Sequence, residues 1–320
     1  MVIQTEFNVW NRWDPLQTIL IGTPPDSKFY SDIRLWRNQK PMLELLDETH
    51  KDLDYLVDVL EQHGVRVLRQ LPNKLLRFDP AGDPDIPSDQ QATENYNFVV
   101  LGKQVVSNHN GYRLMPQWEQ MFGGPRAFDT SPDTVWFELT KILASIKQHV
   151  RTCQWNIVGQ HLFVNYFQFK EKTAQWRNKW IYDLRRWINK WFPTIKLRLI
   201  PMQHKDHMKY ITVKPGVLIA NSPVSDYTKY FPGWDVLHVP DKEFKLKIIM
   251  IDQKTACINT KDKKILDYLR KHHVDTEYTP LRNCERWHQF AHWLYIDILR
   301  QGQPHDHLFH ASGTQRYTFR

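Results

Sequence analysis

Cysteine is scarce in this chain, and its distribution excludes two kinds of small stabilised fold. Three cysteines occur in 320 residues, at Cys153, Cys257 and Cys284. Their number is odd and no two have the spacing of a CxxC motif, which argues against a disulfide framework and against a structural zinc site. We therefore expect the protein in a reducing, cytoplasmic compartment.

Long apolar runs and linker-like segments are missing as well. No run approaches the roughly 18 residues of a membrane span. The first residues show no basic region followed by an apolar stretch, so no signal peptide is expected. A hydrophobic content of 41% and a charged content of 24% are typical of a globular protein. Because no low-complexity linker divides the chain, we expect one domain over residues 1–302, followed by a polar tail over 303–320.

Positive charge is not gathered in one block. The net charge of +8 suggests anionic partners or merely a basic surface. The densest basic stretch, 170–190, also carries tryptophans, and this combination can bind nucleic acid. Its apolar residues recur every three or four positions, which predicts one buried helix face, and we prefer this interpretation to a nucleic-acid surface. The residues of that face are Trp176, Trp180, Leu184, Trp187 and Trp191.

Four segments share one pattern: an apolar run, a short turn with Gly or Asp nearby, and a second apolar run. They cover residues 98–106, 155–164, 211–220 and 248–258. Each is typical of a tight β-hairpin. Their recurrence along the chain indicates a repeat architecture.

Helix and strand signals surround the hairpins. Helices are predicted over 41–63, 134–149, 174–191 and 262–272, and further strands over 18–21, 65–68, 195–200 and 274–278. The segment 286–300 has a mixed pattern that fits neither type. Tight hairpins exclude a purely parallel sheet. A ring of small ββαβ units, with a pocket at its centre, would let neighbouring units bury one another's apolar faces.

Several segments of the chain resemble the amidinotransferases. Residues 8–22, with the phrase Asn11-Arg-Trp-Asp-Pro-Leu16, resemble the opening of that family, and 47–65 is similar to the helix that follows. The hairpin over 211–220 and the segment 292–300 resemble the regions of the family's catalytic His and its nucleophile. The resemblance implies the five-bladed α/β propeller of the pentein superfamily, in agreement with the ring of small units.

The resemblance also implies an activity. Amidinotransferases move an amidino group from arginine to an amine, and relatives hydrolyse guanidino compounds. A Cys thiolate attacks the guanidinium carbon, a His relays protons, and carboxylates hold the guanidinium. This chemistry requires no metal and no cofactor. The implied partner is a small guanidino or amino-acid ligand, and a homodimer is a further expectation because family members often form dimers.

At several positions the chain departs from the family pattern. The family's nucleophile is a Cys directly after a His, whereas here Trp293 follows His292. An indole cannot attack a guanidinium carbon. Gln154 stands where the family has an Asp before the second hairpin, and residues 95–96 replace an Arg-Asp pair before the first. These differences remove the standard nucleophile and part of the guanidinium site.

A His-x-Asp pattern is retained at His204 and Asp206, shortly before the third hairpin. These two residues match the family's catalytic His region, and the alternative is a solvated polar loop. Cys284 is the one cysteine that could act as a displaced nucleophile, with an incidental packing cysteine as the alternative. A metal site of histidines near the end of the chain is considered less well supported than a loose polar tail. These histidines are His305, His307 and His310.

Three hypotheses about function follow. The first is an amidinotransferase-like protein that has lost the covalent chemistry and has a binding or interaction role. The second is a divergent amidinotransferase or guanidino hydrolase, with His204 as acid/base, Cys284 as nucleophile, and substrate contacts from a further set of residues. That set is Gln154, His292 and Trp293. The third is a basic nucleic-acid-associated protein.

Overall fold

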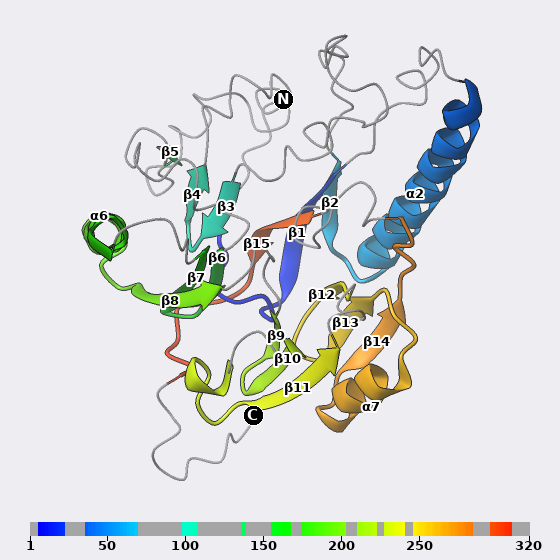
Figure 1. The fold of residues 1–320 in the computed structure, drawn as a ribbon. Coiled ribbons are helices and arrows are strands. Elements are labelled where there is room, and N and C mark those ends of the chain that lie inside the picture. Colours follow the sequence, from blue (N-terminus) through cyan, green and yellow to red (C-terminus); the bar gives the residue numbers. More distant parts are fainter. Residues whose placement is uncertain are drawn as a thin grey trace.

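Small three-stranded sheets are the units of this fold. The computed structural model describes ten segments of the chain: residues 6–22, 36–69, 98–107, 136–138, 155–167, 174–202, 210–222, 227–240, 246–283 and 295–308. Within these segments, five sheets of three strands are arranged around a common centre (Figure 1). The ring of small α/β units predicted from the hairpins is therefore confirmed.

The same strand order recurs from sheet to sheet. The first strand of a hairpin pairs antiparallel with the second, and the second pairs in parallel with a third. Two sheets consist of β3 (Phe98–Leu101), β4 (Gln104–Ser107) and β5 (Trp136–Glu138), and of β6 (Trp155–Val158), β7 (His161–Phe167) and β8 (Lys196–Met202). Two more consist of β9 (Tyr210–Lys214), β10 (Val217–Ser222) and β11 (Asp235–Pro240), and of β12 (Ile248–Met250), β13 (Thr255–Ile258) and β14 (Asp275–Tyr278). The four predicted hairpins are thus confirmed.

The fifth sheet joins segments from the two ends of the chain. β15 (Tyr295–Arg300) takes the place of the first strand and pairs antiparallel with β1 (Leu16–Ile21), which pairs in parallel with β2 (Arg66–Arg69). β15 lies against β3 on one side. On the other side it reaches the β12 sheet, because the Tyr295 hydroxyl donates to the Ile248 carbonyl at 3.0 Å. β12 in turn lies against β9, so β15 completes the ring.

Arg300 fixes this closure. Its side chain is 1% exposed and has three protein acceptors. Nε donates to Asp297 Oδ2 at 2.8 Å, Nη1 to the Asp14 carbonyl at 2.6 Å, and Nη2 to the Met250 carbonyl at 2.9 Å. One buried guanidinium therefore ties β15 to the segment before β1 and to the β12 sheet.

Helices connect the second and third strands of three sheets. α2 (Trp36–Gln62) links β1 to β2, α6 (Ala174–Trp191) links β7 to β8, and α7 (Lys263–Lys271) links β13 to β14. α7 begins after Asp262, whose side chain accepts hydrogen bonds from the main-chain N–H groups of two residues in the first turn. A short 3-10 helix, η4 (Tyr227–Lys229), precedes β11. In Figure 1, α2 and α7 lie on the outside of the ring. None of the described helices could cross a membrane.

Neighbouring sheets pack their apolar faces against each other and so form shared hydrophobic cores. Along β9, Ile211 and Val213 belong to the cluster shared with the β12 sheet, whereas Tyr210 belongs to the cluster shared with the β6 sheet. The two faces of this sheet are therefore covered by different neighbours. A single unit has little core of its own, and packing around the ring supplies the burial.

The helix α6 has the predicted bounds, but its buried face differs at one end. Leu184 and Trp187 are buried as predicted. Trp191 is 40% exposed, and Ile188 and Phe192 are buried in its place. The helix ends at Trp191, and the chain then turns so that Phe192 packs against Trp187, with ring centroids 5.3 Å apart.

Two other predictions need correction. The helix predicted over 134–149 is wrong at its start, because Trp136–Glu138 forms β5 and pairs in parallel with β4; residues 139–149 lie outside the described segments. The unassigned segment 286–300 contains β15, and β11 was not predicted at all. β5, β11 and β15 each pair with a strand that is distant in the chain or reached by a parallel crossover. Local sequence patterns do not reveal such partners.

Candidate functional site at the centre of the ring

The direction of the first strand in each sheet distinguishes two ends of the ring. Each hairpin's first strand runs toward a turn, at Gly102, at Gly159, at Gly216 and in residues 252–254. β15 has the same place in its sheet and ends at Arg300, beside the segment that precedes β1. We name this the turn end. The strand-start end is formed by the first residues of β3, β6, β9, β12 and β15.

The residues predicted for the site precede β6, β9 or β15 in the sequence. They are Gln154, His204, Asp206, Cys284, His292 and Trp293, and all six lie outside the described residues. Their roles therefore stay predictions. The described residues instead define the turn end of the ring and the anchor of the segment that leads to Cys284.

Residues 6–15 cover the turn end. Val9 and Gly102 exchange two main-chain hydrogen bonds, of 2.9 and 2.7 Å. The Gly159 N–H lies 2.7 Å from Asn11 Oδ1 and 3.0 Å from the Trp10 carbonyl. The segment therefore connects the turns of the first two hairpins across the end of the ring.

Residues 301–308 cover the same end. A Cβ at Gly159, whose φ is +56°, would lie 1.7 Å from the His305 carbonyl oxygen, so the approach requires glycine. Asp306 lies 3.0 Å from both His161 Nε2 and Lys196 Nζ. The loose tail expected around His305 is thus packed against the β6 sheet as far as residue 308. With both segments across the turn end, we expect a ligand to reach the axis from the strand-start end.

His161 and Asp306 hold the second segment electrostatically. His161 is fully buried, and Arg198 Nε donates to its Nδ1 at 3.2 Å, so Nε2 carries the proton that it shares with Asp306. Burial lowers the pKa of His161, against the effect of Asp306. Burial would raise the pKa of Asp306, but hydrogen bonds from Lys196 and His161 bring it to about 2. This arrangement is a neutral His beside a carboxylate, with a structural role.

Arg12 acts electrostatically on two buried tyrosines. Burial raises the pKa of both Tyr210 and Tyr295, and the charge of Arg12 opposes each shift in part. Tyr210 begins β9 and Tyr295 begins β15.

Three buried polar groups lie on β6 and β9. They are Asn156 Oδ1, the Tyr210 hydroxyl and Thr212 Oγ1, in residues that are 1–2% exposed. Tyr210 and Thr212 share one face of β9. Burial raises the pKa of Tyr210, and a hydrogen bond with the Asn156 side chain opposes this shift. The Tyr210 ring packs against Tyr227 and Phe231, with ring centroids 5.1 and 5.5 Å apart, so Tyr210 belongs to the apolar cluster shared with the β6 sheet.

The one described thiol cannot serve as a nucleophile. Cys257 is 1% exposed on β13, and burial raises its pKa to about 12. Thiolate chemistry needs the reverse shift. Cys257 is therefore a packing residue of β13. Among the described residues, no group of His, Cys, Asp and Glu side chains could hold a metal ion.

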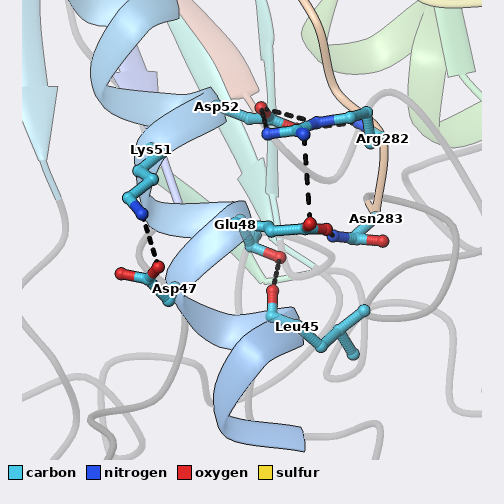
Figure 2. Close-up of polar contacts among 8 residues, drawn as sticks. Leu45, Asp47, Glu48, Lys51, Asp52, Arg282 and Asn283 are labelled. Carbon is cyan, nitrogen blue, oxygen red and sulfur yellow. Dashed lines mark hydrogen bonds and ion pairs between the residues drawn. The ribbon is translucent and has the colours of Figure 1, made fainter. Parts of the chain in front are cut away.

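The segment that leads to Cys284 is anchored on α2. Figure 2 shows Arg282 against Asp52, with Nη2 2.8 Å and Nε 3.1 Å from Oδ1. The Arg282 main-chain N–H also donates to Asp52 Oδ2 at 2.9 Å, and Asn283 donates to Glu48 at 2.8 Å. The hydrogen bonds that Arg282 donates to Asp52 raise the pKa of Arg282. The anchor fixes the chain up to the residue before Cys284.

Sequence reasoning did not single out Arg12 or the buried polar residues of β6 and β9. Arg12 lies within the phrase that carries the family resemblance, and Asn156 follows Gln154 by two positions. Tyr210 and Thr212 alternate with apolar residues along a predicted strand. The alternation was a usable signal, because it places a hydroxyl-bearing face on a strand buried on both sides.

Comparisons with known proteins bear on the fold. No family model matches the chain, and no curated protein matches it. Among solved structures, an amidinotransferase of the saxitoxin biosynthetic pathway from Microseira wollei is similar, with a TM-score of 0.65 and 15% identity over 94% of this chain and 99% of that one. The inosamine-phosphate amidinotransferase from Streptomyces griseus has a TM-score of 0.65 and 14% identity, over 95% of this chain and all of the other.

A hydrolase has a similar structure as well. The dimethylarginine dimethylaminohydrolase from Pseudomonas aeruginosa, in complex with citrulline, has a TM-score of 0.57 and 8% identity over 88% of this chain and 99% of that one. The chain therefore has the fold of these amidinotransferases, a five-bladed α/β propeller. The predicted fold is confirmed. At these identities the likeness concerns the fold.

Proposed function

We propose that this protein is an amidinotransferase-like ring that binds a small ligand at its centre and does not carry out covalent amidino transfer. The observation that carries the proposal is the contrast between a retained fold and a replaced nucleophile. All five sheets keep their strand order, while Trp293 stands where the resemblance places the Cys. Cys257 is too buried to substitute.

The ligand is proposed to be a small guanidino or amino-acid-like compound. Support comes from the neighbour of known structure that holds citrulline. Closure of the turn end favours a blind pocket that opens at the strand-start end. Binding without turnover is compatible with every described contact.

Product analysis tests the proposal. The protein is incubated with arginine plus glycine, and separately with arginine in water, and ornithine, guanidinoacetate and citrulline are measured by mass spectrometry. We expect no product above a heat-denatured control. Turnover that is lost in Cys284→Ser and kept in Cys257→Ser would contradict the proposal.

A second candidate is a divergent enzyme with Cys284 as nucleophile and His204 as acid/base. The anchor of Arg282 and Asn283 on α2 favours it, because a fixed approach would position the following thiol. Rapid labelling of Cys284 by iodoacetamide near pH 7, with Cys257 unlabelled, would support this candidate, since only a lowered pKa gives a thiol that reactivity.

Nucleic-acid binding has weaker support. The exposed side of α6 carries Arg185, Arg186 and Lys190, but Trp187 of this helix is buried against Trp155, with ring centroids 6.3 Å apart. Trp187 therefore belongs to the core and cannot stack on a base, whereas Trp191 at the end of the helix is 40% exposed. Steeply salt-dependent binding to single-stranded DNA would revive this alternative.

A further inference from the structure

The outer side of α2 is acidic in a chain whose net charge is +8. The side chains of α2 are described from residue 43 onward, and among these the exposed charged residues are six acids and one lysine. Many of the acids are separated by three, four or seven positions, so they lie along one side of the helix. We name this set the acidic face: Glu44, Asp47, Glu48, Asp54, Asp58 and Glu61.

Local partners neutralise only part of the acidic face. Lys51 pairs with Asp47 at 2.6 Å, as Figure 2 shows, and an arginine of β2 pairs with Asp54 at 2.9 Å. Among the described residues, neither Asp58 nor Glu61 forms an ion pair. Tyr55 lies on the same side of the helix and is 48% exposed. The face therefore presents negative charge around a large exposed ring.

The outer side of α6 has the opposite charge. Its side chains are described from residue 181 onward, and the exposed charged residues there are Arg185, Arg186 and Lys190, which we name the basic face. Tyr182 is 63% exposed and lies on the same side, four residues before Arg186. Lys190 Nζ lies 4.8 Å from the centroid of the Trp191 ring. Exposed aromatic rings thus accompany the charges on both helices.

The acidic face and the basic face cannot meet within one molecule. Figure 1 shows α2 and α6 on opposite sides of the ring, with the sheets between them. A symmetric contact of either helix with its own copy would bring like charges together, which is unfavourable. The acidic face of one molecule and the basic face of another are complementary in charge. Tyrosine, tryptophan and arginine are also enriched at protein interfaces.

We propose that a second copy of this chain binds the acidic face through its own basic face, in a head-to-tail contact. Each added copy brings a further acidic face and a further basic face, so the contact produces an open chain or a closed ring of copies instead of a symmetric dimer. Because the charged side chains are exposed, the association should be weak and should depend on salt. This contact goes beyond the proposed function, since it involves neither the centre of the ring nor a ligand.

Sedimentation velocity of the full chain tests the contact. The weight-average mass is measured from about 1 to about 200 μM protein, a range that suits weak association. We expect the mass to rise with concentration at low salt and to return to the monomer value in about 1 M NaCl, where the Debye length is about 3 Å. A monomer at every concentration and salt would overturn the proposal, and so would association that strengthens with salt.

Charge reversal on each face locates the contact. One double variant combines Arg185→Glu with Arg186→Glu, and the other combines Asp58→Lys with Glu61→Lys. Each should weaken self-association at least about tenfold, because like charges would then face each other. All four side chains are exposed, so both variants should keep the melting temperature of the parent chain. Self-association of either variant that equals that of the parent chain would contradict the proposal.

A control variant separates the contact from the effect of net charge. Lys263→Glu combined with Lys264→Glu reverses two exposed lysines on α7 and changes the net charge as much as the arginine variant does. It should associate as the parent chain does. Equal loss of association in this control would show that net charge, and not the basic face, is responsible.

Mixing the two face variants gives the decisive result. One variant keeps an intact acidic face and the other keeps an intact basic face. An equimolar mixture should therefore form at least a one-to-one complex, although neither variant associates alone. A mixture that stays monomeric would overturn the proposal. A monomeric parent chain that binds single-stranded DNA through Arg185 and Arg186 would also overturn it and would assign the basic face to nucleic acid.

Discussion

Replacing Asp14 by Asn should change how stability depends on pH. Asp14 is 8% exposed at the turn end, and Asn11 Nδ2 donates to its Oδ2 at 3.0 Å. Burial raises its pKa from 3.8 to about 6, although Asn11 and Arg300 oppose the shift. The folded protein therefore holds a proton that the unfolded chain releases. This contribution to stability is complete below pH 3.8 and is lost as the pH rises through about 6.

The magnitude follows from the shift. A change of about 2 pKa units corresponds to about 3 kcal/mol. An Asn at position 14 keeps a carbonyl oxygen for Asn11 and cannot ionise. At pH 4 the variant and the parent chain should have similar free energies of unfolding, and at pH 7.5 the variant should be more stable by about 3 kcal/mol. In a chain of this length the melting temperature should rise by about 5 °C.

Urea unfolding followed by tryptophan fluorescence, at pH values from 4 to 7.5, measures this difference. Asp47→Asn is the matched control, because Asp47 is an exposed carboxylate paired with Lys51 on α2, and surface pairs contribute little. A difference between Asp14→Asn and the parent chain that stays constant across the range would refute the reasoning. The reasoning would also be refuted if Asp14→Asn became less stable than the parent chain as the pH rises.

Three further changes test the closure of the ring and the anchor on α2. Arg300→Met should lower the free energy of unfolding by about 3–5 kcal/mol in denaturant titrations, because it leaves Asp297 and two carbonyls without a buried partner. Gly159→Ala should cost at least about 2 kcal/mol in the same assay, since its Cβ would overlap the His305 carbonyl. Arg282→Met should cost about 1–2 kcal/mol, less than a fully buried pair because half of the side chain is exposed, and should speed proteolysis after residue 283, seen by mass spectrometry.

Much of the fold could be predicted because each hairpin is local. Between the paired strands lie two residues in three hairpins and four in the β12–β13 hairpin, so alternation and the turn residue specify the strands together. β5 shows the limit of this reasoning. The segment 134–149 has a helical period, but Trp136–Glu138 pairs with β4, about 30 residues earlier, and a parallel partner leaves no trace in the local pattern.

The site was less predictable than the fold. Family resemblance directed attention to residues that precede β6, β9 and β15, and those positions lie outside the described segments. Burial of Asn156 is a property of the assembled ring, because its own strand shows only a polar residue between Trp155 and Ile157.

The pairing of β1 with β15 has a consequence for how the protein is made. β1 leaves the ribosome early and finds β2 and α2 soon afterwards, but its other edge waits for a strand that is translated near the end. During that interval the nascent chain displays an apolar edge that is open to strands of other molecules. Chaperone dependence and loss to aggregates should therefore be governed by the time needed to translate residues 70–300. Slower elongation would lengthen the exposure, even though every completed ring conceals that edge.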